Sequence, residues 1–81
     1  MITEINEPIK VGAVFTAGRV TVSWFTWKNR RIPVERVTFT WKTNEGAKDR
    51  HCFALSNGAE VFEVSFFPGD LRWYLDKIHL P

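Results

Sequence analysis

Apolar and polar residues alternate along most of this chain with a period of two, and no ten-residue stretch shows the 3.6-residue period of a helix. Alternation of this kind is typical of β-strands that bury one face. The pattern predicts six strands, over residues 8–16, 19–27, 32–43, 50–56 and 59–67, and a last strand after Asp70. We expect the polar residues 1–7 to form a flexible leader in front of them.

Turn residues set the expected pairing of the outer hairpins. The turns are Ala17-Gly18, Asn57-Gly58 as a type I′ turn, and Gly69-Asp70 as a type II′ turn. The pairs that follow are Phe15–Val20, Ala13–Val22, Val11–Trp24, Phe53–Phe62, His51–Val64, Phe66–Trp73 and Val64–Leu75. Because the apolar phase slips after Leu75, we expect a bulge near Asp76-Lys77 or the end of pairing.

The stretch 19–43 is expected to form a hairpin that turns at Asn29-Arg30, pairs Val22 with Val37 and Val20 with Phe39, and is apolar on both faces. Val20, Val22 and Val37 share one face, and Phe25, Trp27, Ile32 and Val34 share the other. A five-residue loop after Thr43 gives the pairs Trp41–His51, Phe39–Phe53 and Val37–Leu55, with Phe39 and Trp41 facing inward. A hairpin with two apolar faces suits a bend across a curled sheet. A bulge at Glu35-Arg36, which would bring the large residues to one side, is the alternative.

The expected fold is therefore all-β: an antiparallel six-stranded meander that forms a small closed or half-open barrel, as one domain over residues 8–81. The 81 residues carry a net charge of +2, which permits an acidic partner without requiring one. The single cysteine, Cys52, has no partner for an internal disulfide, and no apolar run is long enough to span a membrane. We expect a cytoplasmic protein that does not act at a membrane.

The most suggestive chemistry lies at the tip of the central hairpin, where Trp27 is followed by Lys28, Arg30 and Arg31 and preceded by Phe25. Aromatic rings beside cationic groups can stack bases and neutralise phosphates. These five residues are the candidate site for nucleic acid or another partner. The alternative is that Trp27 packs in a small core of its own and that the charges are a solvated hairpin tip.

No catalytic or metal-binding motif stands out. His51 and Cys52 are neighbours on a strand, so they point to opposite faces and cannot readily act as a pair. Glu60 and Glu63 also fall on opposite faces, and His79 has no obvious partner ligands. We expect neither an enzyme nor a cofactor or metal site.

Three segments carry a resemblance: VSWFTWKNRRIPVERVTFTW, NGAEVFEVSF and LRWYLDKI. They resemble a bacterial family of small, tryptophan-rich, all-β domains of unknown function, over about residues 20–80. The resemblance implies a small β domain and supplies no catalytic residue. The expected function is thus a non-enzymatic binding module, with single-stranded nucleic acid as the first ligand to test. The alternative is a protein-interaction or structural domain, either monomeric or a homodimer.

Overall fold

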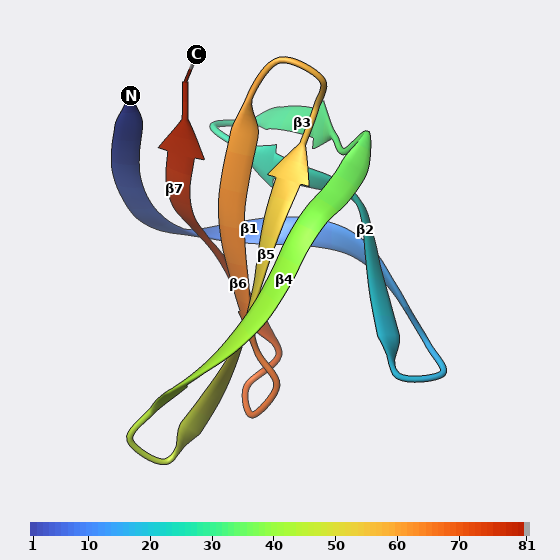
Figure 1. Ribbon diagram of the computed structural model, residues 1–81, viewed down its shortest axis with the longest axis vertical. Coiled ribbons are helices and arrows are strands. Elements are labelled where there is room, and N and C mark those ends of the chain that lie inside the picture. Colours follow the sequence, from blue (N-terminus) through green and yellow to red (C-terminus); the bar gives the residue numbers. More distant parts are fainter. Residues whose placement is uncertain (81) are drawn as a thin grey trace.

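The computed structural model describes residues 1–80, without the side chain of Glu45, and it is all-β. Seven strands lie within these residues: β1 (Ile2–Thr16), β2 (Arg19–Trp27), β3 (Arg30–Pro33), β4 (Arg36–Glu45), β5 (Lys48–Ser56), β6 (Val61–Phe67) and β7 (Arg72–His79). All neighbours are antiparallel, in the order β3-β2-β1-β7-β6-β5-β4. The single sheet curls into a half-barrel (Figure 1). The described residues contain no helix long and apolar enough to cross a membrane.

The sheet is not a simple meander, because the first and last strands of the chain, β1 and β7, pair with each other in the middle of the sheet. β1 pairs with β2 through its second half and with β7 through its first half, from Ile2 onward. Met1 and Leu80 also exchange two hydrogen bonds, of 2.8 and 3.0 Å. The flexible leader expected over residues 1–7 is therefore not observed, since β7 offers these residues a strand edge to pair with.

A second difference is that the expected third strand, 32–43, is broken in two. Its first part, β3, lies at one edge of the sheet, and its second part, β4, lies at the opposite edge. Two residues make the crossing: the Val34 amide donates to the Ser23 carbonyl at 2.9 Å, and the Glu35 amide donates to the Ser56 carbonyl at 2.8 Å. The expected pairs Val22–Val37 and Val20–Phe39 are therefore wrong, and the two edges are held together at one end only.

A β-bulge explains the two apolar faces of the central stretch. Ala13 pairs with Val22 as expected, but Gly12 pairs with Trp24, so Ser23 is an extra residue in β2. The bulge reverses the facing of the residues beyond it, and both Val22 and Phe25 are buried in the same core. The bulge therefore lies at Ser23 in β2, and not at Glu35-Arg36, where the alternative interpretation of the sequence placed it.

The same mechanism corrects the facing of β4. Val37 pairs with Leu55 as expected, but Phe39 pairs with Ala54, so Thr38 is an extra residue. Phe39 consequently lies on the outer face, where it is 65% exposed and its ring stacks on Trp41 at 5.7 Å. The expected inward facing of Phe39 and Trp41 is wrong, as are the pairs Phe39–Phe53 and Trp41–His51.

Four turns also differ from expectation. The central hairpin turns at Lys28-Asn29, and the expected five-residue loop after Thr43 is a two-residue turn at Gly46-Ala47, because β4 continues to Glu45, which pairs with Lys48. The 57–60 loop has four residues: Asn57 Oδ1 accepts from the amides of Ala59 and Glu60, and only Gly58 has a positive φ. The pairing therefore runs Leu55–Phe62 and Phe53–Val64, two residues away from the expected register. The last loop also has four residues, and its positive φ is at Leu71 rather than at Gly69.

The last hairpin confirms the other expectations. Phe66 pairs with Trp73 and Val64 pairs with Leu75, and the register then shifts at Asp76. The core on the concave face joins strands that do not pair with each other. Phe25 of β2 meets Phe62 of β6 at 5.1 Å, edge to face. Buried core residues are Val22, Phe25, Phe53, Leu55, Phe62, Val64, Phe66, Leu75 and Ile78.

Candidate functional site

The cationic tip of the central hairpin is built by a tight turn at Lys28-Asn29. Both residues have positive φ, 52° and 60°, as the two central residues of a type I′ turn require. The turn pairs Trp27 with Arg30, whereas a turn at Asn29-Arg30 would pair Trp27 with Ile32, two residues further along the chain. Arg30 and Arg31 are exposed on β3, at the edge of the sheet. Three cationic side chains are thus gathered within four residues of a rigid turn.

Trp27 serves the fold and the surface together. Its side chain is half-buried and packs against the core, as the alternative interpretation of the sequence proposed. Its Nε1–H donates to Glu7 Oε1 at 3.2 Å, and the Lys28 ammonium lies over its ring, 4.8 Å from the centroid. The Glu7 carboxylate is thereby engaged by the indole N–H, and the Trp27 ring lies beside the cationic side chains of the hairpin tip.

Phe25, the fifth residue of the site predicted from the sequence, does not lie on the surface of the hairpin tip. It is fully buried, with an exposed fraction of 0%, because the bulge at Ser23 turns it into the core. Ile32 and Val34 pack against the same core. Phe25 can therefore support the hairpin but cannot touch a ligand.

The structure adds Trp24, which sequence reasoning did not include. Its indole lies directly on the backbone of Gly12, where a Cβ atom would come within 2.2 Å of the ring. On the Arg31 side, the guanidinium carbon lies 4.2 Å from the ring centroid. Glycine, indole and guanidinium therefore form one contact chain across β1, β2 and β3. The sequence signal was the glycine, an unusual residue inside a strand, which often marks close approach.

Lys10 is the second residue that the structure adds. It pairs with Thr26 on β2, and Thr26 pairs with Arg31 on β3, so the three residues form a row across the sheet. A shallow hollow of about 670 Å³ runs beside this row and the hairpin tip. Among its lining residues in the described chain, Glu7 alone carries a carboxylate. We call the surface around the hairpin tip, formed by Lys10, Trp24, Trp27, Lys28, Arg30 and Arg31, the basic aromatic face. Lys10, Trp24 and Arg31 lie on the outer side of the strands, whereas Trp27 and its partner Arg30 lie on the core side of the tip.

A separate polar cluster lies on the far half of the sheet. The Asp76 carboxylate pairs with Arg50 at 2.7 Å and accepts a hydrogen bond from the Ser65 hydroxyl at 3.1 Å. Burial raises the pKa of Asp76 above its usual range, although Ser65 and Arg50 oppose the shift. Burial also raises the pKa of Cys52, so its thiol is poorly suited to act as a nucleophile.

His79 contacts Glu63 across β6 and β7, and His51 and Cys52 face opposite sides of β5, as strand alternation requires. Within residues 1–80, no three His, Cys, Asp or Glu side chains are grouped so that they could hold a metal ion.

No family model, curated protein or solved structure matches this chain. The resemblance to a bacterial family of small β domains thus stays a prediction.

Proposed function

We propose that this protein is a non-enzymatic module that binds single-stranded nucleic acid on its basic aromatic face. The observation that carries the proposal is the contact between Arg31 and Trp24. An exposed guanidinium held against an indole offers a flat surface on which an unpaired base can stack. The indole is in turn fixed by Gly12, so the surface is formed before any ligand arrives.

Charge supports the same conclusion. Lys10, Lys28, Arg30 and Arg31 are all exposed, and they surround one shallow hollow. Four phosphate contacts would give a salt slope of about −2.8 for a single strand, at roughly 0.7 per contact. A strand following the row from Lys10 across Thr26 to Arg31 would meet a cation at each end and the Trp24 indole beside Arg31. Cations combined with an aromatic ring are the elements that single-strand binding proteins use.

The experiment is a titration of fluorescently labelled oligothymidylate and oligouridylate, twelve nucleotides long, at about 50 mM salt, followed by anisotropy. We expect Arg30→Ala with Arg31→Ala to weaken binding and to reduce the salt slope by about 1.4, because two phosphate contacts are lost. Gly12→Ala should weaken binding and leave the slope unchanged, because the new methyl group displaces the indole without removing a charge.

The matched control is Lys48→Ala, which removes an exposed cation from β5, in the other half of the sheet. It should bind like the parent protein. Absence of binding at 100 μM protein would exclude the proposed function. So would equal losses in Lys48→Ala and in the double arginine variant, since these would indicate non-specific attraction.

A further inference from the structure

The two edges of the sheet are treated differently by the sequence. β3 has four residues and ends at Pro33, and its two arginines are exposed, so it is short, charged and stopped by proline. These are the usual devices that prevent an edge from pairing with another chain. β4 has ten residues, no proline, and an aromatic residue, Phe39, that is 65% exposed. β4 carries a bulge at Thr38, but beyond the bulge its register with β5 is regular from Phe39 to Glu45 and its other side pairs with no strand of the described residues, so this longer stretch is the edge that remains competent to pair.

The free edge of β4 borders a hollow. β2 and β4 approach each other beside the Val34-Glu35 crossing and then diverge toward the tips of the β1–β2 and β4–β5 hairpins (Figure 1). A hollow of about 420 Å³ lies between the diverging parts, and both strands contribute to its walls. Val20 and Phe53 form its apolar floor.

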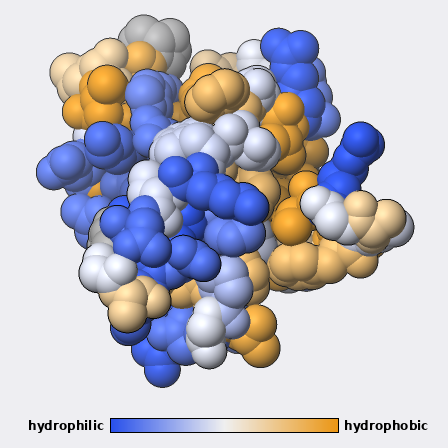
Figure 2. Space-filling model, turned by 60° about the horizontal axis from the view of Figure 1, so that its bottom comes forward, coloured by the Kyte–Doolittle hydropathy of each residue, from blue (hydrophilic) through white to orange (hydrophobic). Residues whose placement is uncertain are grey.

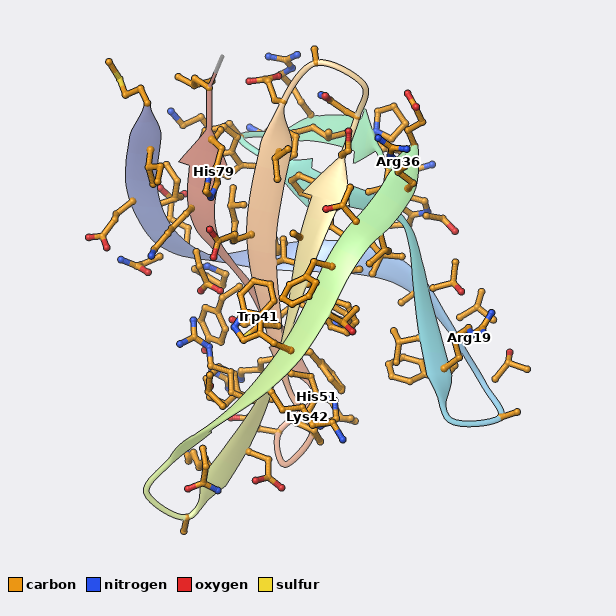
Figure 3. The ribbon with its side chains drawn as sticks, in the orientation of Figure 1. Arg19, Arg36, Trp41, Lys42, His51 and His79 are labelled. Atoms are coloured by element: carbon orange, nitrogen blue, oxygen red, sulfur yellow. The ribbon has the colours of Figure 1, made fainter. Side chains whose placement is uncertain are left out.

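The rim of this hollow is cationic. Lys42 and His51 lie on the side of β4 that faces the β1–β2 hairpin, and Arg19 comes from that hairpin (Figure 3). No carboxylate is found among the described residues that line the hollow. Figure 2, in which the hairpin tips come forward, shows hydrophilic residues over the middle of this face and hydrophobic ones exposed on the side of the β1–β2 hairpin.

The opposite face of β4 is apolar. Phe39 and Trp41 stack on each other and border a second hollow with Ala54 and Val61, and the mutually paired Glu63 and His79 lie at its far side from β4, on β6 and β7. A strand added beside β4 would point alternate side chains to these two faces, because side chains alternate along a strand. One set would meet Lys42 and the other would cover Phe39.

We propose that the free edge of β4 binds an extended peptide in which acidic and apolar residues alternate. The peptide pairs with the β4 backbone as an added strand, as in other cases of β-augmentation. Its carboxylates lie in the hollow beside Lys42, His51 and Arg19, and its apolar side chains cover Phe39 and Trp41. This surface is distinct from the basic aromatic face, which belongs to β1, β2 and β3.

The test uses a labelled peptide of four Val-Glu repeats with acetylated and amidated ends. We expect saturable binding by anisotropy, and at least tenfold slower hydrogen exchange of the β4 amides over residues 38–43 in the saturated complex. A peptide with four Val-Lys repeats should not bind. A peptide with two of its valines replaced by proline should bind at least tenfold more weakly, because proline cannot donate to a strand edge.

Two variants that change the net charge equally separate this proposal from nucleic-acid binding. Lys42→Glu should weaken peptide binding at least tenfold, whereas Lys10→Glu, on the basic aromatic face, should leave it unchanged. Phe39→Ser should weaken it as well, without involving a charge. Lys10→Glu should weaken oligonucleotide binding, so the two proposals fail or stand independently.

Several outcomes would overturn the inference. These are no binding at 1 mM peptide, equal binding of the lysine peptide, or binding without protection of the β4 amides. If the protein alone forms dimers by sedimentation and protects the same amides as its concentration rises, the occupant is a second copy of the chain. If oligothymidylate protects them, the occupant is nucleic acid. Either result would replace the peptide.

Discussion

Truncation of Phe25 tests whether the curled sheet is held closed by contacts between strands that do not pair. Phe25 is completely buried and meets Phe62 edge to face at 5.1 Å, although β2 and β6 are separated by β1 and β7. Phe25→Ala would leave a cavity at this bridge. Phe39→Ala is the matched control, because it removes the same atoms from a ring that is 65% exposed.

The expected magnitudes differ severalfold. A buried phenylalanine truncated to alanine costs about 3–5 kcal/mol. Burying a whole aromatic side chain contributes about 1.5–3 kcal/mol, so the buried third of Phe39 corresponds to roughly 0.5–1 kcal/mol. A chain of 81 residues has a free energy of unfolding of roughly 4–12 kcal/mol. Phe25→Ala therefore removes a large part of the total stability, and Phe39→Ala removes little of it.

The assay is urea unfolding followed by tryptophan fluorescence and far-ultraviolet circular dichroism. With a slope near 1 kcal/mol per molar urea, Phe39→Ala should lower the midpoint by about 1 M or less. Phe25→Ala should lower it by about 3 M or more, or leave the chain unfolded without urea. Phe25→Leu should fall between them. Equal shifts for the two alanine variants would refute the claim that Phe25 bridges the sheet.

Three further predictions follow from single sites. Gly58→Ala should cost about 1–3 kcal/mol, and more than Gly46→Ala, because φ is +96° at Gly58 but +65° at Gly46; urea midpoints measure both. Burial raises the pKa of Asp76, so its contribution to stability is present below pH 3.8 and lost as pH rises through the folded pKa. The wild type should therefore lose stability relative to Asp76→Asn between pH 4 and pH 7, and the opposite trend would show that Arg50 dominates. Trp73→Ala should cost about 2–4 kcal/mol, less than a fully buried aromatic because Trp73 is only partly buried, and a loss below about 1 kcal/mol would contradict its packing against two phenylalanine rings.

Alternation alone was sufficient to predict the fold class and several pairs. The turn at Ala17-Gly18 correctly predicts the Phe15–Val20 pair, and the phase slip after Leu75 correctly predicts the bulge at Asp76. Loop length is less well determined. Lengthening the Asn57-Gly58 loop by two residues moves the register by two, which keeps every side chain on its face. The hydrophobic pattern cannot distinguish these two registers.

Bulges explain most of the remaining errors. One extra residue at Ser23 and one at Thr38 reverse the facing of everything beyond them, and nothing in either local sequence marks the position. The cationic tip could be predicted because its residues are adjacent in sequence. The contact of Trp24 with Arg31 could not, because it depends on the bulge and on the pairing of β2 with β3.

The break at Val34-Glu35 has the largest consequence for function. A continuous third strand would pair with β2 along its whole length and leave no free edge beside Arg19 and Lys42. In the observed fold the two-residue crossing Val34-Glu35 connects the β3 edge to the β4 edge at one end of the sheet. At the other end, β2 and β4 do not pair within the described residues. Within residues 1–80, no strand pairs with the free edge of β4. Val34 and Glu35, at which the expected continuous strand breaks, therefore leave free the edge of β4 at which we expect a partner to bind.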